Sequence, residues 1–573
     1  MFIEGSIVSN KTDILIDNYV KLINSGVSAS EILVLVQNST LKNDFITKVL
    51  EKLETESLEK PLIHSFFSLV YNTVSDNWAF LEDRNIFENP VILPNLSGLE
   101  VSQFILKDIL KKVKFKGYNS RMSLLQQIFR RYSLIVQNNL TPKEVDERAK
   151  ILKEGFSEDA NLAISKLLRR TLELRGFDYL RQCLLFNFIY KNTKYFENIK
   201  YIFIDDADEC TPICIDFIDY ISKNNKDFYI AIDPLGSSRC GYLSADKNNY
   251  TKLKKIFKSD KKITATERIN QTAADLYFNV QNNEQKILQK FSYESFSKRS
   301  ECIDAVIGEI FKLLEKGIKP KDISIITPNI DELLKFSLKE SLNNINLLYL
   351  TGNEKLIQNK YVLSAITILK LNTELKNSLC GFDIRVILSE FLQIPIKYCE
   401  QILKSFDKNK ILIPYEFTDD EYTQKYQSFT KLVHELENSS LKISEQILYI
   451  YNNLFNFTKA DYPQINKFNF FIKQIKDFEN IFGKEFNKHK TDIILQIENS
   501  IISENPYSVL EINTNDLVIS TPQKIIDNHV ITRYQFWLDI SSSDWIKSDT
   551  GPLYNAWFFK KTGKMMNTQS KII

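Results

Sequence analysis

The feature that most limits the possible folds of this chain is a set of short apolar segments, two of which are followed directly by acidic residues. Residues 31–37 (EILVLVQ), 200–204 (KYIFI) and 228–232 (FYIAI) each have the pattern of a fully buried strand, and the last two lead directly into carboxylates. The first of them follows residues 1–7, a short strand, and residues 13–25, whose apolar side chains recur at helical spacing. A strand, a helix and a second strand at this spacing predict a βαβ unit and therefore a parallel sheet.

A second α/β pattern follows further along the chain. Residues 301–316 have helical spacing, and a turn then leads into residues 323–327 (ISIIT), a predicted strand. Residues 516–520 (DLVIS) form the last strand-like stretch. Residues 86–195 and 376–505 are mostly helical in pattern. The sequence therefore predicts an α/β protein with two parallel-sheet cores, each with a mainly helical insertion.

Composition bounds the class of protein. The 573 residues are too many for one hydrophobic core, which stops growing at roughly 250–300 residues. An apolar fraction of 43% with 25% charged residues is typical of folded globular chains. The 74 basic and 72 acidic residues leave a formal net charge of +2, so any nucleic-acid site must be a local groove.

Targeting and cysteine patterns point to a cytoplasmic protein without a membrane partner. The start, MFIEGSIVSNKTD, lacks the apolar run of a signal peptide, and no stretch of about 20 apolar residues occurs. The seven cysteines include no CxxC pair, which argues against a disulfide framework or a metal cluster. Cys210 and Cys214 can share one helix face, but no second pair completes a tetrahedral site.

Residues 5–12 (GSIVSNKT) have the spacing of a phosphate-binding loop, GxxxxGK[ST], except at Asn10. Such a loop needs backbone N–H groups turned toward an anion, a lysine on the phosphates and a hydroxyl on Mg²⁺, here Lys11 and Thr12. Asn tolerates a positive φ better than most residues, so we expect the turn to survive at Asn10. The alternative is a simple strand-to-helix turn with Asn10 near the helix cap.

The strand at residues 200–204 ends in Asp205, Asp206, Asp208 and Glu209. A buried strand followed by acids is the Walker B arrangement when a phosphate loop precedes it. Asp205 would then hold Mg²⁺, and a second acid would orient or deprotonate the attacking water. The alternative is a solvated acidic turn after a core strand.

Six segments resemble, in family order, the motifs of the UvrD/Rep/PcrA-like superfamily 1 DNA helicases. IDDADECTPICIDFI resembles their DExQD box, and FYIAIDPLGSSRCGYLSAD resembles the following GDxxQSIYxFRGA box. PLIHSFF resembles the T-x-H-S-F box, RGFDYL the segment before Walker B, and ITATERINQTAADL the NYRS box. KGIKPKDISIIT with TGNEKLI resembles the start of the second motor domain. Together these matches cover about residues 1 to 360.

The resemblance implies two RecA-like motor domains with ATP bound between them. The expected boundaries are 1–85 and 196–275 for the first, ATP-binding domain, 86–195 for its insertion, 276–375 and 506–573 for the second domain, and 376–505 for its insertion. We expect the second domain to be incomplete at its C-terminal end.

The resemblance also implies site residues. The residues expected to bind ATP are Gly5, Asn10, Lys11 and Thr12; those expected to hold Mg²⁺ are Thr12 and Asp205; the expected catalytic residues are Asp205, Asp206 and Arg268. His64 matches a histidine beside the DNA path, and Tyr242 lies near the aromatic that stacks on a base. The alternatives for these two are a packing histidine and a core aromatic.

Several positions depart from the family pattern. The catalytic glutamate is replaced by Asp206, with Glu209 as a substitute. The γ-phosphate-sensing glutamine falls on Gly236, or on Ser237 with a one-residue shift, and the arginine after the stacking aromatic is Leu243. The adenine-contacting glutamine segment and the last arginine box have no clear match.

The C-terminal stretch corresponds in place to the T-x-H-x-x-K-G-L-E box. Thr521, Gln523 and Lys524 match its start, but the KGLE core is missing. The tryptophans that follow form either a packed core edge or a platform for DNA or a partner: Trp537, Trp545 and Trp557.

Two functions remain open. The first is an ATP-dependent helicase or translocase, a P-loop NTPase that acts in DNA repair on single-stranded or partly duplex DNA. The second is a catalytically impaired, helicase-like subunit that binds DNA or a nuclease or repair partner. The preserved Lys11, Thr12, Asp205 and Arg268 favour the first, and Asn10, Gly236 and Leu243 favour the second.

Overall fold

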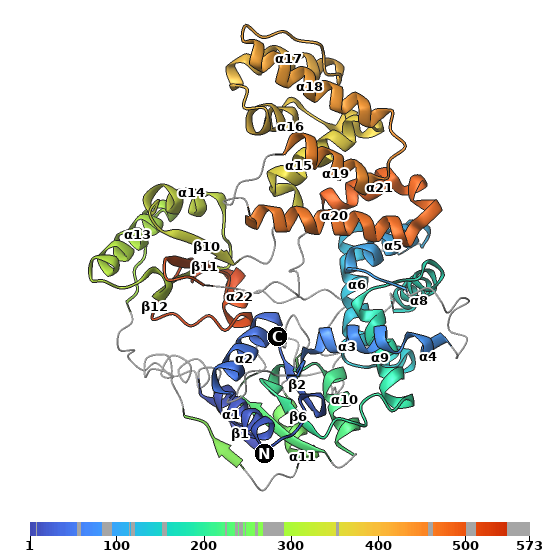
Figure 1. The fold of residues 1–573 in the computed structure, drawn as a ribbon, viewed down its shortest axis with the longest axis vertical. Helices are drawn as coiled ribbons and strands as arrows, with labels where there is room; N and C mark the ends of the chain where they lie inside the picture. The colour runs from blue at the N-terminus through green and yellow to red at the C-terminus, as the bar shows by residue number, and fades with distance from the viewer. Residues whose placement is uncertain are drawn as a thin grey trace.

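The computed structural model of the chain describes residues 1–6, 9–53, 59–82, 94–113, 115, 121–151, 157–223, 226–234, 236, 239, 245–246, 248–257, 262–266, 292–350, 355–455, 462–499 and 512–546. Within these ranges the chain forms two parallel sheets and two helical regions (Figure 1).

The first sheet contains six parallel strands among the described residues, in the order β3-β2-β6-β7-β1-β8. Its strands are β1 (Phe2–Glu4), β2 (Ile32–Val36), β3 (Leu62–Ser65), β6 (Tyr201–Ile204), β7 (Asp227–Ile232) and β8 (Lys262–Thr264). The central strands are apolar on both faces because helices cover both sides, as is usual for parallel sheets.

Two sets of helices cover this first sheet. On one face, α1 (Lys11–Asn24) and α2 (Ser39–Lys52) bury Tyr19 and Phe45 against Phe203 of β6. On the other face, Ile204 and Ile230 belong to a larger core with four helices. These helices are α3 (Phe66–Asp76), α9 (Tyr179–Asn192), α10 (Pro212–Ser222) and α11 (Asn249–Ile256).

The described part of the chain holds a second sheet of four parallel strands, in the order β10-β11-β9-β12. Its strands are β9 (Ile323–Ile326), β10 (Asn346–Leu350), β11 (Asp516–Ser520) and β12 (Tyr534–Trp537). The helices α13 (Arg299–Glu315) and α14 (Glu332–Ser341) pack on one face, and α22 (Pro522–Asp527) follows β11. The expected α/β fold with two parallel sheets is confirmed, and it is consistent with two RecA-like domains.

Helices fill the two long segments between the sheet strands. The first segment contains α4 (Trp78–Glu82), α5 (Leu99–Lys112), α6 (Arg121–Gln137), α7 (Pro142–Ile151) and α8 (Ser157–Leu174), with the small parallel pair β4 (Asn95–Leu96) and β5 (Gly176–Phe177). The second contains α15 (Lys360–Leu371), α16 (Gly381–Val386), α17 (Ile396–Asn409), α18 (Asp420–Glu437), α19 (Ile443–Leu454), α20 (Tyr462–Phe482) and α21 (Phe486–Glu498). None of the helices in the described ranges is long and apolar enough to cross a membrane.

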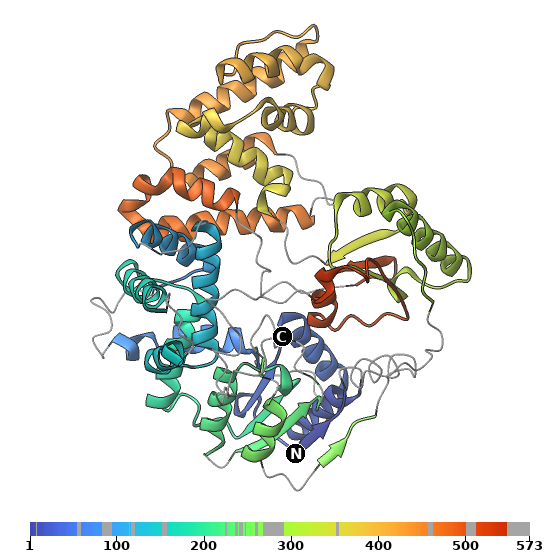
Figure 2. The same ribbon diagram turned by 180° about the vertical axis from the view of Figure 1, so that it is seen from behind.

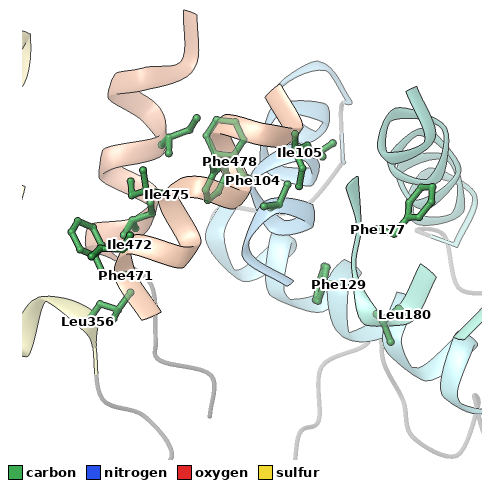
Figure 3. Packing of buried hydrophobic residues seen from close by; sticks show 14 of the residues in the cluster. Phe104, Ile105, Phe129, Phe177, Leu180, Leu356, Phe471, Ile472, Ile475 and Phe478 are labelled. Atoms are coloured by element: carbon green, nitrogen blue, oxygen red, sulfur yellow. The ribbon is translucent and has the colours of Figure 1, made fainter. Parts of the chain in front are cut away.

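The two helical regions pack on each other. Figures 1 and 2 show α20 and α21 beside α5 from both sides of the molecule. The ring of Phe104 on α5 meets Phe478 of α20 edge to face at a centroid distance of 5.6 Å (Figure 3). It meets Phe482 of the same helix edge to face at 5.5 Å. Arg170 of α8 lies 2.6 Å from Glu485, at the start of α21. One hydrophobic core therefore runs through both helical regions.

Candidate functional site

The site lies at the carboxyl end of the first sheet, where open α/β sheets bind ligands. Lys11 is the first residue of α1, and its side chain is almost completely buried. Its ammonium group donates to the carbonyl of Ser6 at 3.0 Å and lies 2.8 Å from Oδ1 of Asp206. Burial alone would lower the pKa of Lys11, but the charges of Asp206 and Asp205 outweigh burial and raise the pKa above its ordinary value.

Thr12 is joined to Asp205, which directly follows β6. Its hydroxyl lies 2.9 and 3.1 Å from the two carboxylate oxygens of Asp205, although the residues are 193 positions apart. Burial and the neighbouring Asp206 raise the pKa of Asp205 to about 6, although Lys11 and Thr12 act in the opposite direction. The predicted phosphate-loop residues and the predicted acids therefore meet.

Asp206 has an unusual backbone, and the side chains of Lys11 and His529 both approach its carboxylate. Its φ of 47° and ψ of 51° place it in the left-handed region. Burial would raise its pKa, but Lys11 and His529 outweigh burial and hold the pKa well below its usual range. Its Oδ2 lies 3.2 Å from Nε2 of His529 and accepts no aligned hydrogen bond from the described residues. Oδ2 of Asp206 can therefore still accept a hydrogen bond within this buried cluster of charged side chains.

Asn10 does not use the positive φ that asparagine tolerates. Asn10 has φ −87° and occupies the N-cap position of α1, as in the alternative of a strand-to-helix turn. Its side-chain oxygen accepts from the backbone N–H of Thr266 at 2.7 Å, and its own N–H donates to the Thr266 carbonyl. Asn10 therefore ties the start of α1 to the residues after β8, where a glycine would lack the side-chain bond.

At Gly5, neighbouring atoms leave no space for a side chain. A Cβ at this position would lie 2.3 Å from Oγ of Ser9 and 2.7 Å from Cβ of Ala265. Its N–H donates to the carbonyl of Ile232 at the end of β7. The close approach holds the turn after β1 against both neighbouring strands.

Gly236 lies close to the carboxylate of Asp208. A Cβ there would lie 1.9 Å from Oδ2 of Asp208, and the other oxygen of Asp208 accepts from the Asp233 N–H at 2.9 Å. The carboxylate of Glu209, the expected substitute base, accepts the backbone N–H of Arg239 at 2.9 Å. The predicted Ser237, Tyr242, Leu243 and Arg268 lie outside the described residues.

Four residues of the cluster were missed by sequence reasoning: Gln37, Arg239, Asp527 and His529. Gln37 follows β2, and its amide donates to the carbonyls of Asp205 and Asp206 at 3.3 and 2.9 Å. Arg239 is buried; it donates to Gln37 at 3.3 Å and to the carboxylate of Asp527 at 3.0 Å. Asp527 ends α22 and His529 follows it, so both come from the second sheet's domain. Arg239 lies inside a segment that resembled a family box, which is the signal that could have identified it.

His64 lies apart from this cluster, at the end of the edge strand β3. It is half-buried, and its Nδ1 lies 3.4 Å from the hydroxyl of Ser68 in α3. Burial, together with the nearby Lys42 and Lys60, lowers the pKa of His64 to about 4. The ring is therefore neutral at physiological pH and is next to two cations on the same edge.

Within the ranges that the structure describes, the cysteines and tryptophans named from the sequence are not among the residues that hydrogen-bond to Asp205 and Asp206. Cys210 and Cys214 are buried, and the described residues hold no group of three or more His, Cys, Asp or Glu that could bind a metal. Mg²⁺ at phosphate sites uses one or two carboxylates plus phosphate and water, so it does not need such a group. Trp537 and Trp545 stack at 5.5 Å, and Trp537 is exposed; Trp557 lies outside the described residues.

The C-terminal box candidates lie around α22. Thr521 caps the helix, Gln523 is exposed, and the ammonium group of Lys524 lies 3.8 Å from Asp527. This helix reaches the first domain through Asp527, so the stretch after β11 contributes to the contact between the two sheets' domains.

Comparison with known proteins addresses the first part of the chain. Residues 1–258 match the family model described as the UvrD/REP helicase N-terminal domain. No curated protein sequence matches the chain. The matched range contains Lys11, Thr12, Asp205 and Asp206, which the fold brings together. Residues 1–258 of this chain belong to the UvrD/REP helicase N-terminal domain family.

Proposed function

We propose that this chain binds Mg²⁺-ATP at the carboxyl end of the first sheet and hydrolyses it to move along single-stranded DNA. The observation that carries the proposal is the convergence of Lys11 and Thr12 with Asp205 and Asp206. A helix N-terminus with a lysine attracts phosphate, and a hydroxyl beside a carboxylate suits Mg²⁺. The donor set therefore fits the nucleotide and its metal.

Each residue has a distinct part in the proposed reaction. When bound, Mg²⁺-ATP supplies the phosphoryl group and the metal charge that offsets the phosphate oxygens. Lys11, now paired with Asp206, would bind a phosphate oxygen, and Thr12 and Asp205, now joined to each other, would hold the metal, which would supply positive charge beside the phosphates. The carboxylate of Asp206, which Lys11 would release, would orient the attacking water.

Further residues enter the proposal only through the family resemblance. Arg268 would reach the γ-phosphate, with Gly5 and Asn10 shaping the turn around the phosphates. His64 and Tyr242 would contact DNA, His64 beside Lys42 and Lys60 on the β3 edge.

We also propose the domain division stated above. The first motor domain comprises residues 1–85 and 196–275, and the second comprises 276–375 and 506–573. The intervening segments, 86–195 and 376–505, are their insertions.

A nucleotide hydrolysis assay with and without single-stranded DNA tests the proposal. We expect DNA-stimulated turnover in the wild type and background turnover in Lys11→Ala. Lys404→Ala, an exposed lysine on α17, is the matched control and should behave as the wild type. Tyr242→Ala should weaken chiefly the stimulation by DNA. Equal background rates in the wild type and in Lys11→Ala would overturn hydrolysis as the function.

One observation favours the second candidate, an impaired helicase-like subunit of a repair or nuclease complex. Gly236, which has no side chain, stands where the resemblance expects the glutamine that senses the γ-phosphate, and a Cβ there would lie 1.9 Å from Oδ2 of Asp208. Such a subunit would bind DNA and nucleotide without turnover. Binding of a fluorescent ATP analogue and of a labelled oligonucleotide, combined with background hydrolysis, would favour this candidate.

A further inference from the structure

Two residues in a rare backbone conformation meet where the two sheets' domains touch. Asp206 has φ 47° and His529 has φ 50°, and neither is glycine. Non-glycine residues in this region are strained and persist only where their surroundings hold them. The side chains of these two residues approach to 3.2 Å. Both sides of this contact therefore have a backbone that the surrounding structure must hold in place.

A second path also joins Asp206 to the second domain. Gln37 donates to the Asp206 carbonyl at 2.9 Å and accepts from Arg239 at 3.3 Å. Arg239 in turn donates to the carboxylate and the carbonyl of Asp527, at 3.0 and 3.2 Å. The main chain of Asp206 is thus connected to Asp527, while its side chain contacts His529. Both partners come from the segment after β11.

The shared carboxylate gives this arrangement a consequence for the reaction. Lys11 and His529 both lie against Asp206, one on each oxygen. In the proposed function Lys11 leaves Asp206 for phosphate. His529, whose Nε2 lies 3.2 Å from the other oxygen, is then the neighbour that still fixes the direction of this carboxylate.

We infer that His529 is a positioning residue of the second domain that sets Asp206 for the attacking water, with Asp527 and Arg239 as its support. This inference rests on the proposed function. It makes hydrolysis, rather than nucleotide binding, depend on contact between the two domains. The nucleotide would still meet Lys11 and Thr12 when the contact is broken.

The first test uses the protein without nucleotide. Hydrogen exchange should be compared in the wild type, His529→Ala and His529→Gln. Exchange of the amides at Ala207–Cys210 should rise roughly tenfold in His529→Ala, because the residues after Asp206 lose their restraint. His529→Gln, whose amide can still donate to Asp206, should change less. His434→Ala, an exposed histidine on α18, is the matched control.

The second test separates binding from turnover. The affinity for a fluorescent ATP analogue should stay within about twofold in His529→Ala, while turnover falls by roughly 10–100-fold. The double variant His529→Ala with Asp206→Asn should turn over no more slowly than Asp206→Asn alone. The reason is that His529 acts only through the carboxylate that Asp206→Asn removes. His529→Gln should recover part of the turnover.

The outcomes are distinct. Unchanged exchange and wild-type turnover in His529→Ala would overturn the inference and leave the proposed function intact. An equal loss of binding and turnover would show that His529 only maintains the fold of the site, which also overturns it. Background turnover in the wild type would overturn the proposed function and the inference together.

Discussion

The ammonium group of Lys11 lies 2.8 Å from Oδ1 of Asp206, and the two side chains are only 2% and 5% exposed. Removing one partner of a buried ion pair leaves a charge without compensation, which typically costs about 3–5 kcal/mol. His529 also neighbours Asp206, so we expect Lys11→Met to lower the free energy of unfolding by about 3 kcal/mol, the low end of that range. Urea denaturation measures this change.

The control for this prediction is Lys404→Met on α17, which should change stability little. The double variant Lys11→Met with Asp206→Asn should lose less than the sum of the two single losses, since both remove the same pair. Equal effects of Lys11→Met and Lys404→Met would show that the buried pair does not form in solution.

Gly236 and Gly308 make a matched pair of glycine substitutions. A Cβ at Gly236 would lie 1.9 Å from Asp208, whereas a Cβ at Gly308, inside α13, meets nothing within 4 Å. Gly236→Ala should therefore destabilise the protein by about 1–3 kcal/mol through overpacking. Gly308→Ala should stabilise it by about 0.5–1 kcal/mol, because alanine loses less conformational freedom in a helix. Denaturation curves of both variants test this, and a stable Gly236→Ala would contradict the close approach to Asp208.

His64 should make stability depend on pH. Its pKa is lowered to about 4 from the ordinary histidine value of 6.5, chiefly by burial. Between these values the unfolded chain binds a proton that the folded chain does not, so stability rises with pH in this window. The contribution is fully present above pH 6.5 and is lost progressively as the pH falls to about 4. His64→Gln should flatten this part of the stability profile; an unchanged slope would mean that the ring is solvated.

Phe104 should couple the two helical regions. Its ring is 5% exposed and packs on Phe478 and Phe482 of α20. Phe104→Ala should cost about 3–5 kcal/mol, the range for truncating a buried phenylalanine. Phe336→Ala on α14, where the ring is 65% exposed, is the control. Limited proteolysis should cleave α20 and α21 faster in Phe104→Ala; equal cleavage in both variants would contradict the coupling.

The parts of the site that the sequence predicts are those with a local pattern. The buried strand before Asp205 is an uninterrupted apolar run, and Lys11 and Thr12 follow β1 at a fixed spacing. Parallel strands align their carboxyl ends, so the encounter of Thr12 with Asp205 follows from the topology. The two-sheet fold was predictable for the same reason.

The cross-domain residues carry no such pattern. Arg239 and Asp527 are 288 positions apart, and only the packing of the two domains brings them together. The backbone at Asn10 also could not be read from its residue type, because its hydrogen bonds with Thr266 select an ordinary negative φ. In the sequence, Gly236 indicated the loss of a γ-phosphate-sensing residue. In the structure, a Cβ at this position would lie 1.9 Å from Oδ2 of Asp208, which sequence reasoning could not show.

The order of strands in the first sheet has a consequence for synthesis on the ribosome. β1 pairs only with β7 and β8 in the described sheet, and the amino group of Met1 bonds to the carbonyl of Phe228, 227 positions later. The strand that leads into the predicted phosphate loop is therefore made long before the two strands that it pairs with. Loop-closure entropy makes such distant pairing slow, and an unpaired apolar strand is prone to aggregate while it waits. A nascent chain halted before β7 should therefore depend on chaperones to stay in solution.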